Sequence, residues 1–156
     1  MPWLDLIDES FVVAARRDAR EMLCDEGCWR TWFPGLRLQA YDDRGLDGVR
    51  WRVTGDLAGT AEVWLEEFGD GVLVHVFIRA DRTAEGSDSE PAPVTRPRRE
   101  RDRLRRRYAV PLKHHLLAAK DALEGDRRPG HPRVARPIES SVRGTTTDDR
   151  GERADG

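Results

Sequence analysis

The sequence predicts an α+β fold in which a curved antiparallel sheet of about five strands wraps around a long C-terminal helix. Residues 48–82 contain three runs of alternating apolar and polar residues separated by turn residues, which is typical of adjacent antiparallel strands. Residues 98–124 carry one apolar stripe at intervals of three or four, which is typical of an amphipathic helix. A sheet with one apolar face and a helix with one apolar stripe bury each other most simply by packing together.

The N-terminal part predicts a strand followed by a short helix. Residues 4–14 form the strand, because their centre, Phe11 to Val13, consists of β-prone residues. Residues 16–26 form the helix, with Ala19, Met22 and Leu23 facing inward, and Gly27 interrupts it.

Three aromatic residues follow and predict a second short helix. Trp29, Trp32 and Phe33 lie at helical spacing and make one aromatic ridge, which Pro34-Gly35 ends. Residues 36–41 then alternate between apolar and polar side chains, so we expect the second strand there.

Residues 48–66 predict a hairpin with a three-residue loop, Leu57-Ala58-Gly59, in which Gly59 is left-handed. This register places Trp51 opposite Leu65 on an apolar face. It places Arg50 opposite Glu66 on the other face, so the second face is charge-paired.

The next turn allows two registers. A two-residue turn at Asp70-Gly71 places Val74, Val76 and Ile78 on the inner face. A three-residue turn at 69–71 places Leu73, His75, Phe77 and Arg79 there instead. The choice decides whether any polar group of this strand faces the helix.

The remaining segments divide into a loop, a helix and a tail. Residues 83–97 are rich in Ser, Pro, Ala and acidic residues, and predict a flexible connection. A helix from about Arg98 to Glu124 ends at Gly125, and Pro111 should kink or split it. Residues 126–156 have too few apolar residues to fold, so we expect a disordered tail after a domain at 1–125.

Composition excludes several classes of protein. The formal net charge of −2 gives no global polyanion-binding signature. The two cysteines, Cys24 and Cys28, are too few for a disulfide framework and do not have zinc-ligand spacing. The first residues lack the features of a signal peptide, and no window is apolar enough for a transmembrane helix, so we expect a cytoplasmic protein.

Four segments in this order resemble a known superfamily: SFVVAARRDAREML, CWRTWFPGL, GVRWRVTGDLAGTAEVWLEE followed by GVLVHVFIRAD, and LKHHLLAAKDALEG. Residues 4–125 thereby resemble the START-like, Bet v 1-like (SRPBCC) superfamily, and within it the bacterial polyketide cyclase/dehydrase and lipid transport type. The resemblance implies a helix-grip fold with a cavity between sheet and helix. It also implies binding of a lipid, a polyketide or a similar small hydrophobic molecule, and no cofactor.

The candidate ligand-binding residues are those predicted to face that cavity. The alternative interpretation is a filled hydrophobic core without a ligand. The set is Trp29, Trp32, Phe33, Trp51, Val53, Val63, Leu65, Phe77, Leu112, His115 and Leu116.

A second hypothesis is an enzyme of the polyketide cyclase or dehydratase type. His75 and Arg79 share a face of one strand, so on the inner face His75 would move protons and Arg79 would hold an enolate or carboxylate. The alternative places both on the outer face, where this hypothesis loses its candidate catalytic residues.

A third hypothesis is an interaction protein that uses the arginine run from Arg96 to Arg107. Eight arginines stand there against Glu100 and Asp102, which fits contact with an anionic surface. The run has no interleaved aromatic residues and no nucleic-acid motif, so we expect no specific nucleic-acid partner. The alternative is a solvated helix face. No metal-binding motif is present in the sequence.

Overall fold

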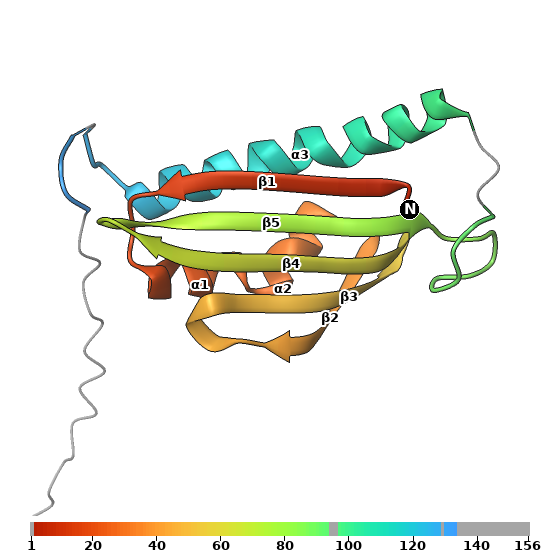
Figure 1. Ribbon diagram of the computed structural model, residues 1–156, viewed down its shortest axis with the longest axis horizontal. Coiled ribbons are helices and arrows are strands. Elements are labelled where there is room, and N and C mark those ends of the chain that lie inside the picture. Colours follow the sequence, from red (N-terminus) through yellow and green to blue (C-terminus); the bar gives the residue numbers. More distant parts are fainter. Residues whose placement is uncertain (1, 94–96, 129, 134–156) are drawn as a thin grey trace, which may run out of the picture.

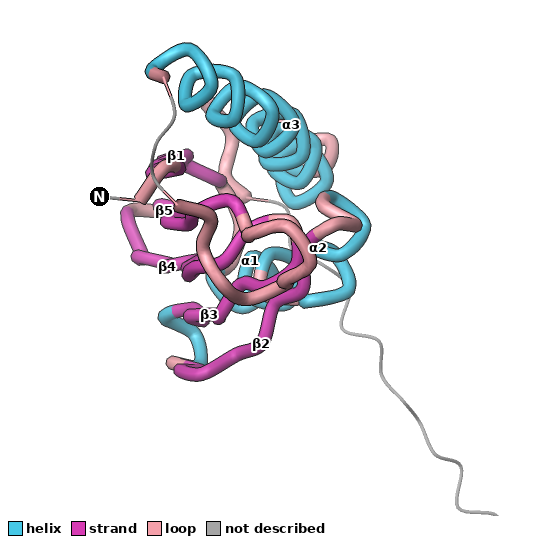
Figure 2. The backbone as a smooth tube through the Cα atoms, turned by 90° about the vertical axis from the view of Figure 1, so that its right-hand side faces the viewer, coloured by secondary structure: helices cyan, strands magenta, loops and turns pink. Residues whose placement is uncertain are grey.

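The computed structural model describes residues 2–93, 97–128 and 130–133, and in them a five-stranded antiparallel sheet and three α-helices. The strands have the spatial order β1-β5-β4-β3-β2. The elements are β1 (Leu4–Val12), α1 (Arg16–Leu23), α2 (Glu26–Trp32), β2 (Leu36–Asp43), β3 (Gly48–Gly55), β4 (Leu57–Phe68), β5 (Gly71–Arg82) and α3 (Arg98–Glu124). Figure 2 shows the sheet curving from β1 to β2 with α1, α2 and α3 on one side of it. This is the predicted helix-grip arrangement.

The long helix α3 has the predicted bounds. Its apolar stripe is buried against the sheet and the short helices, and consists of Leu104, Tyr108, Leu112, Leu116, Ala119 and Leu123. Pro111 removes the N–H that would bond to the carbonyl of Arg107, yet α3 remains one helix. Buried neighbours on both sides of Pro111 hold the helix together. Gly125 follows with φ 58°, as expected for a C-terminal glycine.

The break between the first two helices is not where the sequence predicted it. Helix α1 ends at Leu23, and α2 begins at Glu26, so Gly27 lies inside α2. The Asp25 carboxylate accepts a hydrogen bond from the Gly27 N–H at 3.0 Å. An aspartate at the N-cap satisfies an otherwise unpaired helical N–H, and this outweighs the poor helix propensity of glycine.

The β3–β4 turn also differs from the prediction. Strand β4 begins at Leu57, so the predicted loop residues are part of the strand, and Trp51 faces Ala61 instead of Leu65. Gly59 has no positive φ; the left-handed residue at this turn is Gly55, with φ 105°. The register moved by an even number of residues, so Trp51 and Leu65 still share the inner face. Arg50 pairs with Glu62 at 3.3 Å instead of with Glu66.

The length of the β4–β5 turn decides which residues of β5 lie on the inner face of the sheet. Phe68 pairs with Gly71, so the two-residue turn is Gly69-Asp70, one residue earlier than the two-residue option in the sequence. Gly69 is left-handed, with φ 57°. Val74, Val76 and Ile78 consequently lie on the inner face and are at most 1% exposed.

The first part of the connection between β5 and α3 carries backbone hydrogen bonds. Thr83 bridges Pro91, and the N–H of Ala84 donates to Glu90 at 2.8 Å. The N–H of Gly55 donates to the carbonyl of Asp88 at 2.8 Å, which ties this loop to the end of β3. Residues 94–96, the last part of the predicted flexible segment, lie outside the described residues.

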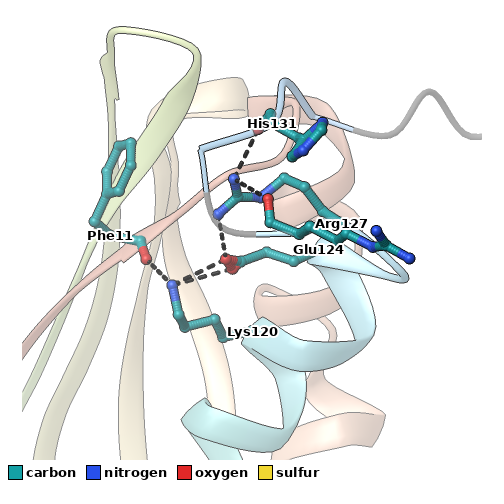
Figure 3. Close-up of polar contacts among 6 residues, drawn as sticks. Phe11, Lys120, Glu124, Arg127 and His131 are labelled. Atoms are coloured by element: carbon teal, nitrogen blue, oxygen red, sulfur yellow. Dashed lines mark hydrogen bonds and ion pairs between the residues drawn. The ribbon is translucent and has the colours of Figure 1, made fainter.

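The C-terminal end of α3 is fastened to β1 (Figure 3). The Lys120 ammonium donates to the carbonyl oxygen of Phe11 at 2.5 Å and to the Glu124 carboxylate at 3.1 Å. Arg127 lies 3.5 Å from the same carboxylate and donates to the carbonyl oxygen of His131 at 2.7 Å. We call these three side chains, Lys120, Glu124 and Arg127, together with the carbonyl groups of Phe11 and His131, the C-terminal clasp. Most of the predicted disordered tail, residues 129 and 134–156, lies outside the described residues.

Candidate functional site: an opening between the sheet and α3

The inner face of the sheet is closely packed. Trp29, Trp51, Val53, Val63 and Leu65 are each at most 1% exposed. The indole N–H of Trp29 donates to the carbonyl oxygen of Leu23 at 2.8 Å, so its one polar group is satisfied. Of the other predicted ligand-binding residues, Phe33, Leu112 and Leu116 are buried in the same core. Trp32 and His115 are half-buried at its edge.

Aromatic rings form a continuous path through this core. The ring of Tyr108 on α3 lies 5.7 Å from the ring of Phe33, which lies 6.3 Å from Trp29. Trp29 in turn lies 5.5 Å from Trp51 on β3. Beside this path, Trp32 of α2 and His115 of α3 stack at 5.2 Å. The path runs from the first half of α3 to β3 on the inner face of the sheet.

The surface end of this path is an opening made of two adjoining depressions of about 200 and 160 Å³. Both depressions are lined by Arg82, Leu104 and Arg107. Their other lining residues are Glu100 and Arg103 in the first, and Asp56, Thr83 and Tyr108 in the second. Most of the lining residues come from the end of β5 and the first half of α3. The end of β5 and the start of α3 lie at the same end of the molecule (Figure 1). We call it the α3 opening.

Helix geometry explains how apolar and basic groups meet at the α3 opening. Leu104 and Tyr108 are one turn apart and belong to the buried stripe, at 6% and 5% exposure. Arg103 and Arg107 directly precede them in the sequence, so they form a parallel row on the exposed flank of the same stripe. The opening therefore has an apolar floor and a basic rim.

Arg107 at the α3 opening is only weakly paired. Arg107 lies 4.0 Å from Asp56, and both side chains are more than half exposed. The Arg107 guanidinium also lies over the Tyr108 ring, 5.7 Å from its centroid. Burial raises the pKa of the Tyr108 hydroxyl, an effect that the nearby Arg107 and Arg82 partly oppose.

We expect Tyr108→Phe to make the protein less sensitive to alkali. The folded pKa of Tyr108 lies above its unfolded value of about 10, so its contribution to stability is fully present below that pH and is lost as pH rises through the folded value. Urea denaturation at pH 8 and pH 11 should show a smaller loss of unfolding free energy for Tyr108→Phe than for the parent. Tyr41→Phe is the control, because Tyr41 is 54% exposed. Equal alkaline losses in parent and Tyr108→Phe would contradict the assignment.

The structure places the predicted catalytic pair on the outer face, contrary to the position that the enzyme hypothesis requires. His75 stacks on Trp64 at 4.3 Å between ring centroids, and its two ring nitrogens lie 3.3 Å from Glu9 and 3.2 Å from Glu66. Arg79 pairs with Asp5 at 3.3 Å. The two-residue turn at Gly69-Asp70 is the physical reason, because it points every odd-numbered residue of β5 away from α3.

Phe77 shares this outer face and stacks beside His75 at 6.5 Å, so it does not line the inner core as the sequence prediction required.

Cys24 and Cys28 are free thiols on different elements, Cys24 at the end of α1 and Cys28 within α2. Burial raises the pKa of both thiols. Among the described residues, no group of three or more His, Cys, Asp or Glu side chains is placed to hold a metal ion. No described helix is long and apolar enough to cross a membrane.

Sequence reasoning missed the α3 opening as a site. It placed Leu104 and Tyr108 on the apolar stripe and the arginines on a basic run, but it did not connect them with Arg82 or Thr83. The missing information is that the end of β5 and the start of α3 lie at the same end of the molecule (Figure 1). The signal for this site that the sequence did contain is the overlap between the arginine run, Arg96 to Arg107, and the start of the apolar stripe at Leu104.

The architecture and the opening together define the class: a helix-grip protein in which a curved antiparallel sheet packs on a long C-terminal helix, with a candidate ligand site at one end. The described residues form the helix-grip arrangement that the sequence predicts. No family model matches the chain, and no curated protein matches it.

Similarity to solved structures is distant. The Aha1 dimer from Colwellia psychrerythraea is 14% identical, with a TM-score of 0.49, over 78% of this chain and 96% of that one. The di-domain ARO/CYC protein StfQ from the steffimycin biosynthetic pathway is 16% identical, with a TM-score of 0.47, over 78% of this chain and 50% of that one. Ara h 8.0201 is 9% identical, with a TM-score of 0.39, over 74% of this chain and 96% of that one. We therefore base the functional proposal on this chain's own residues.

Proposed function

We propose that this protein binds a small hydrophobic ligand, such as a lipid or a polyketide-like molecule, between the sheet and α3. The observation that carries the proposal is the α3 opening, whose floor of Leu104 and Tyr108 continues directly into the aromatic core. Binding sites for small molecules are concave and combine apolar surface with a few polar groups. This opening is concave and sets Leu104 and Tyr108 beside charged side chains.

The ligand enters beside Tyr108 and lies along the aromatic path. Tyr108 and Phe33 contact each other through their rings, and no described side-chain hydrogen bond holds the Tyr108 hydroxyl, so a ligand that separates the two rings breaks no such bond. The innermost rings, Trp29 and Trp51, belong to the predicted binding set and report on occupancy through their fluorescence. Half-buried Trp32 and His115 border the same path from the side of α2.

Catalysis is not part of this proposal. His75 and Arg79 are paired with carboxylates on the outer face, away from the α3 opening. The hypothesis of a cyclase or dehydratase thereby lacks the inner-face residues on which the sequence based it.

The test is native mass spectrometry of protein purified from its own cells, combined with titration of Nile red, an uncharged hydrophobic dye. We expect a retained small-molecule adduct and saturable dye binding that quenches tryptophan fluorescence. Leu104→Trp, which fills the floor of the opening, should weaken dye binding about tenfold or more. Leu117→Trp is the matched control, because Leu117 lies on the same helix and is 47% exposed.

Circular dichroism establishes that each variant is folded. Thr83→Trp is a second blocking variant at the rim of the opening, should Leu104→Trp not fold. A clean apo mass together with no saturable dye binding to the parent protein would refute the proposed function and leave the inner face as a filled core.

A further inference from the structure

We propose that the ligand is an anionic amphiphile whose acidic head group binds the guanidinium groups of Arg82, Arg103 and Arg107 at the rim of the α3 opening. Its apolar part lies on Leu104 and Tyr108. This inference rests on the proposed ligand-binding function and adds the chemical class of the ligand.

Three guanidinium groups from two elements surround one depression of about 200 Å³. Arg82 is the last residue of β5, whereas Arg103 and Arg107 lie one turn apart on one flank of α3. A guanidinium presents a planar fork of N–H donors that matches the oxygens of a carboxylate or phosphate. Groups that converge from a strand end and a helix are fixed relative to each other by the fold.

The arginines of the α3 opening are less tightly paired than three others, Arg16, Arg20 and Arg44. Arg16, Arg20 and Arg44 lie 2.9, 2.9 and 2.6 Å from Asp47, Asp43 and Glu62. At the α3 opening, Arg107 has only its 4.0 Å contact with Asp56. Within the described part of the chain, no ion pair is formed by Arg82 or Arg103, so their donors can turn to a ligand.

The rim contains more basic than acidic side chains, although two carboxylates belong to it. Glu100 and Asp56 line the depressions together with the three arginines. The adjoining first turns of α3 add further arginines, so residues 98–107 contain seven arginines against Glu100 and Asp102. Basic residues at the start of a helix oppose the helix dipole, and a bound anion relieves that repulsion.

The floor beneath the rim is apolar, and this selects an amphiphile over a free anion. Leu104 and Tyr108 are 6% and 5% exposed, and the Tyr108 ring continues to Phe33 at 5.7 Å. A free inorganic anion would contact the rim alone. A ligand with an alkyl or aromatic body contacts both rim and floor, and in doing so shields its own apolar surface from water.

The experiment compares decanoate with decanol, which share a chain and differ in the charge of the head group, by isothermal titration at pH 8. We expect the parent to bind decanoate more tightly than decanol. The double variant Arg103→Gln/Arg107→Gln should lose about tenfold or more in decanoate affinity and change little toward decanol, because only the charge-assisted hydrogen bonds are removed. The matched control is Arg101→Gln/Arg105→Gln, an exposed pair that is also one turn apart and that removes the same charge from the opposite side of the helix.

Each other outcome has a definite meaning. Decanol binding without a preference for decanoate would overturn this inference and leave the proposed function standing. Binding of neither probe would remove the proposed function itself. Equal losses in the two double variants would show diffuse attraction to the arginine run and would overturn the specific site. Inorganic phosphate that competes as strongly as decanoate, or binding only to anionic phosphatidylserine vesicles, would also overturn it.

Discussion

Replacing Trp51 with alanine is expected to lower the free energy of unfolding by about 3–5 kcal/mol. Trp51 is fully buried, and its ring lies 5.5 Å from Trp29 at the centre of the inner face. Removing it deletes a large apolar group and leaves a cavity that the surrounding strands cannot close. Urea denaturation followed by far-UV circular dichroism measures the loss.

Trp64→Ala is the matched control for Trp51→Ala. Trp64 lies on the neighbouring strand, faces outward and is 37% exposed. The stacking of Trp64 on His75 contributes some stability, but we expect Trp64→Ala to lower the free energy of unfolding by less than half as much as Trp51→Ala. Equal losses would mean that the two faces of the sheet are wrongly assigned. If Trp51→Ala cannot be recovered folded, the comparison uses phenylalanine variants instead. Trp51→Phe should then lower the free energy of unfolding more than Trp64→Phe does.

Gly59→Ala is expected to cost about 2–3 kcal/mol, because it overpacks the sheet. A Cβ at Gly59 would lie 2.6 Å from the Cα of Ala80 and would overlap the carbonyl oxygen of Arg79, both on β5. Backbone of an adjacent strand cannot move aside without breaking the β4–β5 ladder. Differential scanning calorimetry or urea denaturation checks the prediction.

Gly69→Ala provides the comparison for this prediction. Gly69 is left-handed at φ 57°, but an added Cβ would meet no atom within 4 Å, so only backbone strain of about 1 kcal/mol is expected. In the hairpin predicted from sequence, Gly59 was the left-handed turn residue and would show this smaller cost. A loss at Gly59 no larger than that at Gly69 would thus favour the predicted turn over the observed strand.

The faces of the sheet could be predicted from the sequence better than its turns could. Alternation fixes which residues share a face, so Trp51, Val53, Val63 and Leu65 were correctly grouped although their partners were not. The turn itself had two candidate glycines, Gly55 and Gly59, and periodicity does not choose between them. The choice depends on the neighbouring strands: Gly55 meets Gly35 and β2, and Gly59 meets β5.

The long helix was predictable for a different reason. Its stripe from Leu104 to Leu123 keeps one period, and Gly125 marks the end without an alternative. The candidate site was not predictable in the same way. It joins Arg82 to Tyr108 through a long connection, and no local pattern reports where such a segment returns to the fold. The face of β5 on which His75 lies was not predictable either, because it changes when the β4–β5 turn is one residue longer.

The position of the C-terminal clasp shows where a reporter group or an affinity tag can be attached without blocking the α3 opening. Lys120 and Glu124 hold the last turn of α3 at the end of β1 that lies farthest from the α3 opening. With a rise of 1.5 Å per residue, Glu124 lies roughly 25 Å along the helix axis from Arg107. Immobilising the protein through a group attached beyond Gly125 therefore leaves the arginine rim accessible to ligands, whereas an attachment at Arg98 would obstruct it.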